Sequence, residues 1–397
     1  MRLRLLPFLA LLLFGLPARS ATVLVLQFHN NSTYSDLDWV GESIAETLIT
    51  EFGVANEIVL NRASRAEAMR RLSLRPNADY TKATLIRLGQ TLDADYICFG
   101  NFELDPASGG AQLKDSSIRI SAQFIDLRKM HDGPELSEAG KISELSRLEE
   151  HLAYESLVYL EPHAALKLDD FISPRKTIRL DAEESYVRGL LSANKEQKQK
   201  WFLQASALDP KFQGPAFELG KLALEQKQYA QAMDWFGRIP AGDPNYADAR
   251  FKMGLAAYGT GEYARAAEYF REVVKTFPLS EVYNDLGAAE DALNQPNAAD
   301  DFRRALESDP NNPAYLFNLG LTLLKNGSFD EAAKRFQQVF DKNPADTEAH
   351  ALLDQARGHQ PVLQTASQKS PPDRLKSSFN ETAFRQLKAM LQPGNGR

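Results

Sequence analysis

Few side chains in this chain of 397 residues are spaced for catalysis or metal binding. The six histidines are scattered without metal-ligand spacing, and the sequence has no G-x-x-x-x-G-K-[ST] phosphate loop, G-x-S-x-G elbow or H-E-x-x-H motif. His29 ends a predicted strand, where loops often carry function, but a structural histidine is the better interpretation because no catalytic partner is evident. The sequence therefore predicts a protein that is not an enzyme and that needs no cofactor or metal.

Other residues that could react have simple interpretations. Cys98, the single cysteine, lies in the apolar run 96–99 and is predicted to be a buried, inert thiol. One cysteine also excludes a disulfide scaffold. Two acidic pairs, Asp93 with Asp95 and Glu149 with Glu150, are predicted to be ordinary capping or surface charges.

The N-terminal residues predict export. Arg2 and Arg4 precede the apolar stretch 5–16, and Ala18-Arg19-Ser20 supplies small residues at a cleavage site. This is the layout of a signal peptide over residues 1–20, with the cut before Ala21. An uncleaved anchor is the alternative, although a membrane span needs about 20 apolar residues. No cysteine follows the cut, so a periplasmic or secreted protein is expected rather than a lipoprotein.

The composition restricts the partners. Hydrophobic residues make up 43% of the chain, which excludes a wholly disordered protein. Cleavage would remove three arginines and take the net charge from −7 to −10. An acidic surface repels a phosphate backbone, so no nucleic acid partner is expected. No run long enough for a transmembrane span is expected after cleavage.

A period of about 34 residues dominates the second half of the chain. Glycines preceded by Leu or Met recur at intervals of 34, 33 and 33 residues, as Gly220, Gly254, Gly287 and Gly320. Alanine followed four residues later by phenylalanine recurs with them, as Ala232, Ala266, Ala298 and Ala332 with Phe236, Phe270, Phe302 and Phe336. A proline then follows, at Pro210, Pro244, Pro278, Pro310 and Pro344. This order of markers resembles the tetratricopeptide repeat (TPR).

Each marker has a physical role in a pair of helices. The glycine permits close approach, the phenylalanine fills the space between helices, and the proline ends the second helix because it lacks an N–H. With a degenerate first repeat around Gly189, residues 183–357 are predicted to form five repeats and a cap helix in one all-α superhelix. The fourth repeat is one residue short at 294–297, so a tighter turn is expected there.

The TPR resemblance implies a concave groove lined by the first helix of each repeat. A peptide-binding groove is one interpretation of these positions, and packing within each repeat is the other. Glu218 and Asp285 occupy positions where some TPR proteins carry a clamp for a partner's terminal carboxylate, which puts that mode of recognition in doubt. The predicted groove residues are Phe217, Lys221, Leu224, Phe251, Leu255, Tyr258, Asn284, Ala288, Asp291, Phe317, Leu321 and Leu324.

Residues 21–165 are predicted to form a compact mixed α/β domain. Short apolar runs at 23–26 and 57–60 and a hairpin at 95–102 and 117–124 indicate strands, with helices between them and at 145–160. This domain resembles the TolB N-terminal and FlgO-like domains of bacterial envelope proteins, which implies a binding or assembly role. The resemblance is carried by Val25-Leu26-Gln27-Phe28 with Asn30, Asp38-Trp39-Val40-Gly41-Glu42, Asn61-Arg62, Leu88-Gly89 and Asp95-Tyr96-Ile97 leading to Gly100.

Two connecting segments and a tail complete the chain. Residues 166–182 are predicted to be a linker and 358–379 a flexible linker, followed by an amphipathic helix over 380–392. Its apolar face comprises Phe384, Leu387, Met390 and Leu391. Residues 358–397 carry six basic and two acidic side chains, whereas 183–357 carry 20 basic and 26 acidic. We therefore expect this helix either to dock on the repeats or to be offered, as a disordered tail, to another protein.

Together these features predict an exported envelope scaffold or adaptor whose TPR groove binds other proteins or peptides, including its own C-terminal helix. A sensor in which the α/β domain binds a small ligand and the repeats relay the signal is the main alternative. A hydrolase with an unrecognised site and a cytoplasmic adaptor are two others.

Overall fold

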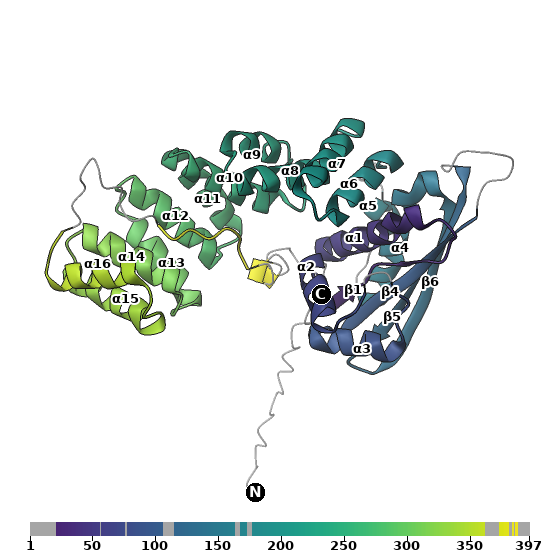
Figure 1. Ribbon diagram of the computed structural model, residues 1–397, viewed down its shortest axis with the longest axis horizontal. Helices are drawn as coiled ribbons and strands as arrows, with labels where there is room; N and C mark the ends of the chain where they lie inside the picture. The colour runs from purple at the N-terminus through teal and green to yellow at the C-terminus, as the bar shows by residue number, and fades with distance from the viewer. Residues whose placement is uncertain are drawn as a thin grey trace, which may run out of the picture.

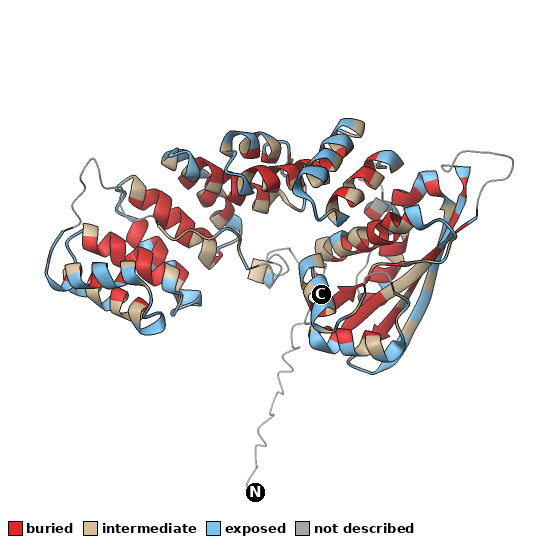
Figure 2. Cartoon of the chain, viewed as in Figure 1, coloured by how far each residue is buried: buried red, intermediate tan, exposed pale blue. Residues whose placement is uncertain are grey.

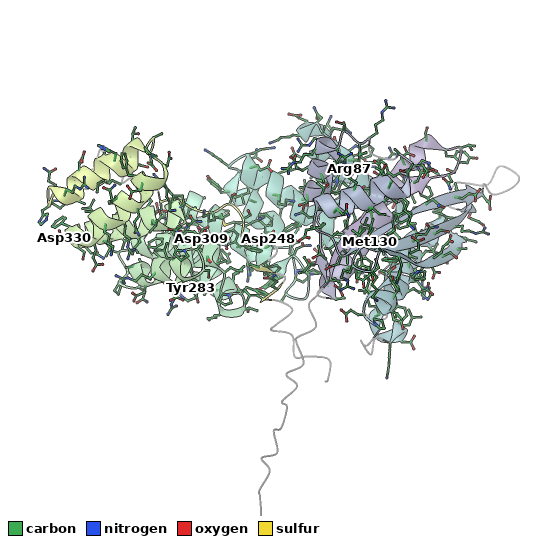
Figure 3. The ribbon with its side chains drawn as sticks, turned by 90° about the horizontal axis from the view of Figure 1, so that it is seen from below. Arg87, Met130, Asp248, Tyr283, Asp309 and Asp330 are labelled. Carbon is green, nitrogen blue, oxygen red and sulfur yellow. The ribbon has the colours of Figure 1, made fainter. Side chains whose placement is uncertain are left out.

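The computed structural model describes residues 21–55, 57–75, 78–105, 115–162, 167–172, 177–361, 373–380, 383–384 and 386–387. An α/β domain is followed by a long arc of paired helices (Figure 1). In Figure 3, Met130 lies within the α/β domain and Asp330 lies at the far end of the arc of helices. This arrangement confirms the predicted fold class. The predicted signal peptide, residues 1–20, lies outside the described residues.

The α/β domain is built on a mixed sheet with the order β3-β1-β4-β5-β6, in which β2 also pairs with β4. β1 is parallel to β3 and β4, and β2 is parallel to β4, whereas β5 is antiparallel to both β4 and β6. The parallel part follows from the intervening helices, because a parallel connection needs a crossover. The strands are β1 Thr22–Val25, β2 His29–Asn30, β3 Ile58–Val59, β4 Tyr96–Asp105, β5 Ser117–Asp126 and β6 His131–Lys141.

Helices cover both faces of this sheet. In β1 and the residue after it, Val23 and Val25 pack in the core beneath α1 (Asp38–Val54) and α4 (Leu145–Leu160). Leu24 and Leu26 pack beneath α2 (Arg62–Arg71) and α3 (Lys82–Thr91). Successive residues of a strand face opposite sides, so an uninterrupted apolar run is what a strand buried on both faces requires. Cys98 is fully buried in β4, and burial raises the pKa of its thiol.

The predicted hairpin is in fact the first part of a three-stranded meander. β6 was not expected, because His131–Lys141 contains two glycines, a proline and mostly polar side chains. It forms the edge of the sheet, where one side has no strand to pair with and polar residues are tolerated. Met130, with φ of 54°, makes the turn into it and is 58% exposed.

Five helix pairs and a cap helix form the arc. α5 (Leu168–Ile172) lies within the predicted linker, and the first repeat helix begins at Leu180 rather than at residue 183. The repeat helices are α6 Leu180–Leu191, α7 Lys195–Leu208, α8 Gln213–Glu225, α9 Tyr229–Phe236, α10 Tyr246–Gly259, α11 Tyr263–Thr276, α12 Ser280–Ala292, α13 Ala298–Ser308, α14 Pro313–Lys325 and α15 Phe329–Lys342, capped by α16 Thr347–Arg357.

The glycine and phenylalanine markers of each repeat contact each other. A Cβ added to Gly254 would lie 2.5 Å from the ring of Phe270, and one added to Gly220 would lie 2.6 Å from Phe236. The same pairing recurs in the other repeats. The ring therefore packs flat against the glycine of the facing helix, which explains why both residues recur together. Figure 2 shows the resulting buried stripe along the facing sides of the helices.

Two local expectations were wrong. The turn of the fourth repeat is not tighter: residues 293–297 separate α12 from α13, with Asn294 in the left-handed region at φ of 55°. The repeat is shorter because its second helix is shorter: α13 has 11 residues, whereas α11 and α15 have 14. In the second repeat α9 ends at Phe236, well before Pro244, and Pro240 follows closely.

The two halves meet where α1 packs against α6. Ser43 donates to Glu183 at 2.8 Å, and Thr47 donates to Glu149 at 2.6 Å. Glu149 is fully buried, which contradicts its interpretation as a surface charge. Its position in α4 places it on the buried face of that helix. Burial, reinforced by the carboxyl group of Glu183, raises the pKa of Glu149 well above its ordinary value.

Candidate functional site

The concave face of the repeats holds a segment of the same chain. Residues 373–380, which lack helical structure, run along α10, α12 and α14 in Figure 1. The predicted flexible linker 358–379 therefore contains a segment bound to the groove. Its composition is polar, so its own hydrophobicity did not reveal this. We call residues 373–387 the tail segment.

Two asparagines of the groove hold the main chain of the tail segment. The backbone N–H of Arg374 donates to Asn318 Oδ1 at 2.8 Å, and its carbonyl accepts from Asn318 Nδ2 at 3.2 Å and from Asn284 Nδ2 at 3.0 Å. Asn318 also donates to Asn284 Oδ1 at 2.9 Å. Both side chains are fully buried. Because such contacts recognise the backbone, they can hold any residue at this position in an extended conformation.

Asp285 makes the equivalent contact one repeat earlier. It precedes Gly287 by two residues, as Asn318 precedes Gly320, and it accepts the backbone N–H of Lys376 at 2.9 Å. Neighbouring repeats thus bind alternate residues of the tail segment. Asp285 was expected to weaken recognition of a terminal carboxylate, and here it accepts a main-chain N–H instead. Burial raises its pKa well above the ordinary value.

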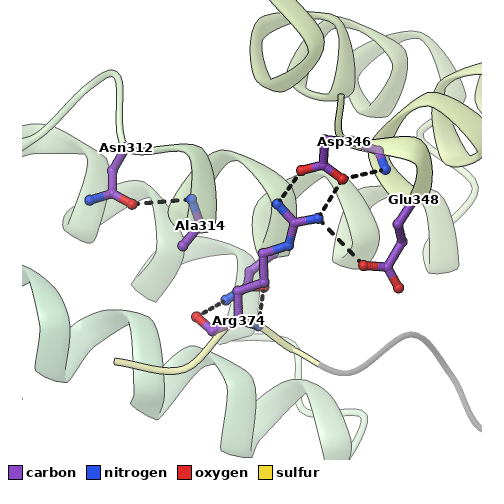
Figure 4. A network of polar contacts seen from close by, with 7 residues as sticks. Asn312, Ala314, Asp346, Glu348 and Arg374 are labelled. Atoms are coloured by element: carbon purple, nitrogen blue, oxygen red, sulfur yellow. Dashed lines mark hydrogen bonds and ion pairs between the residues drawn. The ribbon is translucent and has the colours of Figure 1, made fainter. Parts of the chain in front are cut away.

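The side chain of Arg374 fills a charged site beside α14 and α16 (Figure 4). Its Nη1 and Nη2 atoms lie 2.6 and 2.9 Å from the two carboxylate oxygens of Asp346, and Glu348 lies 3.4 Å away. The guanidinium carbon is 3.5 Å from the centre of the Phe317 ring. A bidentate ion pair with a carboxylate, combined with stacking on an aromatic ring, is a geometry suited to arginine. Accordingly the pKa of Asp346 is lowered, mainly by its hydrogen bonds to Arg374.

Flanking polar residues are also engaged. Tyr258 donates to Asp373 Oδ2 at 2.6 Å, and burial raises the pKa of Asp373 to about 6. The Lys376 ammonium lies 3.2 Å from Asn312 Oδ1 and 4.9 Å from the centre of the Tyr315 ring. The groove therefore offers hydrogen bonds and negative charge over the basic part of the tail segment.

Aromatic rings hold the other end. The ring centre of Phe379 lies 5.4 Å from that of Phe251 and 4.9 Å from that of Phe384. Phe384 in turn lies 4.6 Å from Phe277. Leu387 packs in the same cluster. Edge-to-face and tilted ring pairs at these separations contribute about 0.5–1.5 kcal/mol each beyond the area they bury.

The predicted groove residues divide between the two interpretations. Tyr258, Asn284, Phe251 and Phe317 contact the tail segment, and Leu255 belongs to the cluster that holds Phe379. The others complete the repeats: Phe217 and Leu224 pack in the second repeat, Lys221 pairs with Glu218 at 2.9 Å, Ala288, Leu321 and Leu324 are core residues, and Asp291 accepts from Thr322 at 2.8 Å and pairs with Lys325.

The predicted docking face of the tail is described in part. Phe384 and Leu387 lie against the repeats, whereas Met390 and Leu391 lie outside the described residues. Sequence reasoning missed Asn318, Asp346 and Tyr315. Asn318 could have been found from its register, since it shares with Asp285 the position two residues before the repeat glycine. For Asp346 there was no comparable indication in the sequence, because an aspartate just before a helix is already explained as its N-cap, which Asp346 is for α16.

The α/β domain contains one further cluster of ligand-type side chains. Ligand atoms of Glu138, His151 and Glu155 lie within 4.8 Å of one another, and His151 Nδ1 pairs with Glu138. His151 and Glu155 are four residues apart on α4, which places them on the same face of the helix, and neither was predicted to bind a metal. The ion pair accounts for the contact of His151 with Glu138. Across the described residues, no helix combines the length and apolar character that crossing a membrane requires.

Comparisons with known proteins agree on the repeats. Solved structures similar to this chain include YrrB, described as a TPR protein with an unusual peptide-binding site, at 22% identity over 43% of this chain and 91% of YrrB, with a TM-score of 0.39. MamA from Desulfovibrio magneticus RS-1 is similar at 20% identity over 42% of this chain and 94% of MamA, with a TM-score of 0.39. No curated protein matches the chain. Family models of the tetratricopeptide repeat match residues 217–281, 251–313 and 289–356, so this part of the chain consists of tetratricopeptide repeats, as its period predicted.

Proposed function

We propose that this chain is an exported bacterial envelope scaffold or adaptor that binds segments of other proteins in the groove of its repeats. The observation that carries the proposal is the extended tail segment, whose Arg374 backbone is bound through both its N–H and its carbonyl by Asn318. Main-chain contacts of this kind suit a groove that accepts polypeptide. The proposal assigns no catalytic step to the chain.

Export is supported by the N-terminal sequence. Arg2, Arg4 and the apolar stretch 5–16 have the layout of a signal peptide, and the resemblance of the α/β domain to TolB N-terminal and FlgO-like domains favours the periplasm. Cell fractionation of the full-length chain tests this location. Recovery in the cytoplasm with residues 1–20 intact would favour the cytoplasmic adaptor instead.

Photo-crosslinking tests the groove. A photoreactive residue replaces Leu255, which lies in the groove, or Lys275, an exposed residue of the second helix α11 that serves as the control. We expect intermolecular products at position 255 that an excess of a peptide with the sequence of residues 371–387 suppresses, and fewer at position 275. Identical products at both positions, insensitive to the peptide, would contradict binding in the groove.

A small-molecule sensor is favoured by one observation. A cavity of about 470 Å³ lies between the end of α1, the loop that follows α9, and the helices α10 and α11, and Val54, Pro244 and Phe384 line it. Its size is within the range of ligand pockets, and it joins both halves of the chain to the tail segment. A thermal-shift screen with metabolites tests this alternative, since a ligand of the folded state raises the unfolding temperature.

A further inference from the structure

Three side chains of the tail segment enter separate sites in the groove. The first is Arg374, which stacks on Phe317 and forms two bonds to Asp346. Lysine at this position would lack the planar fork that makes both bonds at once. A neutral residue would leave the two carboxylates of Asp346 and Glu348 without their cation. This site therefore selects arginine.

The second site selects a cation two residues later. Lys376 is placed there by the bond from its backbone N–H to Asp285, and its ammonium group faces Asn312 and the Tyr315 ring. Burial, and then the nearby carboxyl groups of Glu281, Asp285 and Asp309, raise the pKa of the Tyr315 hydroxyl, so acidic side chains lie close to this position. An acidic or apolar side chain would be disfavoured here.

The third site selects an aromatic ring. Phe379 fits between Phe251 of the groove and Phe384 of the tail segment. Ser377 and Ser378, between the second and third sites, are exposed. The groove thus reads residue type at three positions of an extended segment and leaves the two serines in solvent.

We propose that the groove recognises extended segments with the pattern Arg-x-Lys-x-x-Phe, and that the tail segment is an internal competitor for a partner protein that carries the same pattern. This inference rests on the proposed function of the groove. The charges support a basic partner segment, because residues 183–357 have six more acidic than basic side chains, whereas residues 358–397, which include the tail segment, have four more basic than acidic ones. The tether keeps the effective concentration of the tail segment at about a millimolar level, so a partner must bind tightly or at several points to displace it.

A labelled peptide with the sequence of residues 371–387, added to the full chain, tests both parts by fluorescence anisotropy. We expect it to bind at least about tenfold more tightly to a chain whose own tail carries Arg374→Ala and Phe379→Ala, because the competitor is weakened. In the peptide, Arg374→Ala should cost about tenfold or more, whereas Ser377→Ala serves as the matched control and should cost little. Asp346→Asn in the chain, which keeps the cap of α16, should weaken the unaltered peptide.

The possible failures are distinguishable. Equal binding of the Arg374→Ala and unaltered peptides would overturn the pattern but leave groove binding intact. Equal affinity of the unaltered and tail-weakened chains would overturn the internal competition. If neither peptide binds a tail-weakened chain whose circular dichroism is unchanged, the proposed function itself fails. Doubling of the molecular mass with concentration, abolished by the tail substitutions, would assign the tail segment to a second copy and contradict the internal competitor.

A second inference rests on the start of β1. The backbone N–H of Ala21 donates to Glu57 Oε2 at 2.9 Å, although Glu57 is only 1% exposed. Burial and the neighbouring carboxylate of Glu161 raise the pKa of Glu57 to about 8. The next N–H, of Thr22, donates to Asp95 Oδ2 at 2.8 Å, so the partly buried Asp95 accepts the backbone at the start of β1. The buried carboxyl group of Glu57 therefore lies against the nitrogen of Ala21, which is neutral while it remains in a peptide bond.

We infer that the buried carboxyl group of Glu57 receives the α-ammonium group that forms when a peptidase hydrolyses the bond between Ser20 and Ala21. Water supplies the oxygen of the new Ser20 carboxylate, and the nitrogen of Ala21 becomes an ammonium group. That group offers three N–H donors where the amide offers one, and its charge compensates Glu57 and Glu161. Processing at this bond would thus stabilise the α/β domain.

Two forms of the chain test this inference, one beginning at Ala21 and one with Gly-Ser placed before it to keep the peptide bond. We expect the form beginning at Ala21 to unfold at a temperature several degrees higher at pH 7.5, and Glu57→Gln to reduce the difference. The mass of the exported chain should correspond to a start at Ala21. Equal unfolding temperatures, an undiminished difference in Glu57→Gln, or a different start would each overturn the inference.

Discussion

Replacing Glu149 by glutamine is expected to stabilise the chain at neutral pH and to make its stability less sensitive to pH. Glu149 of α4 and Glu183 of α6 are buried where the α/β domain meets the first repeat. Burial is the main cause that raises the pKa of both carboxyl groups, and for Glu149 the proximity of Glu183 adds to it. Two carboxyl groups this close in a buried site favour a shared proton over two negative charges.

The sign follows from the proton balance. An isolated carboxyl group of this type has a pKa of 4.5, so the unfolded chain releases a proton above that pH which the folded chain retains. Stability therefore falls as pH rises, by about 1.4 kcal/mol per pH unit for each retained proton. Over two units, from pH 5.5 to 7.5, one retained proton therefore lowers the stability by at most about 3 kcal/mol. A glutamine can accept from Thr47 and donate to Glu183 without holding a proton, so most of this loss should disappear.

Urea unfolding at pH 5.5, 6.5 and 7.5, combined with hydrogen exchange of α1 and α6, measures the effect. Glu144→Gln, at an exposed position just before α4, is the matched control and should leave the pH dependence unchanged. If the curves for Glu149→Gln and the unaltered chain run parallel against pH, the two carboxyl groups do not retain a proton and the reasoning is refuted.

Three further results are expected. Gly254→Ala should lower the free energy of unfolding by about 1–3 kcal/mol, because its Cβ would meet the Phe270 ring, whereas Gly242→Ala, with no atom within 4 Å, should be nearly neutral in the same urea titration. Docking of the tail segment should weaken as pH rises from 4.5 to 7, since burial raises the pKa of Asp373 to about 6; hydrogen exchange of the tail should lose this dependence in Asp373→Asn. Alkylation of Cys98 should proceed at the rate of unfolding in urea, and rapid modification of the native chain would show that its thiol is accessible.

The repeats could be predicted because their markers act locally. Gly254 and Phe270 are 16 residues apart and touch, so both the period and the fold depend on contacts within one repeat. The strands of the α/β domain were predictable where both faces are buried, as in β1. The edge strand β6 was not, because its partner β5 is on one side only and its polar residues resemble a loop.

The groove was less predictable than the fold because its contacts join residues far apart in the sequence. Asn318 and Arg374 are 56 residues apart, and Asp285 and Lys376 are 91 apart. No periodicity constrains such pairs, and the tail segment is extended because the groove supplies its hydrogen bonds. A charge balance between tail and repeats could indicate attraction, but it could not indicate which residues of the tail would lie in the groove.

The position of the α/β domain explains why the concave face is the surface left for a partner. A stack of repeats needs its exposed ends covered. At the first repeat α1 provides this cover, with the Ser43 and Glu183 contact at the junction, and at the last repeat α16 provides it with Leu352 and Leu353 buried. Both ends of the stack are therefore covered by other parts of the chain. On the inner face, Leu375 and Phe379 of the tail segment are only partly buried, and a competing segment could replace their contacts with the repeats.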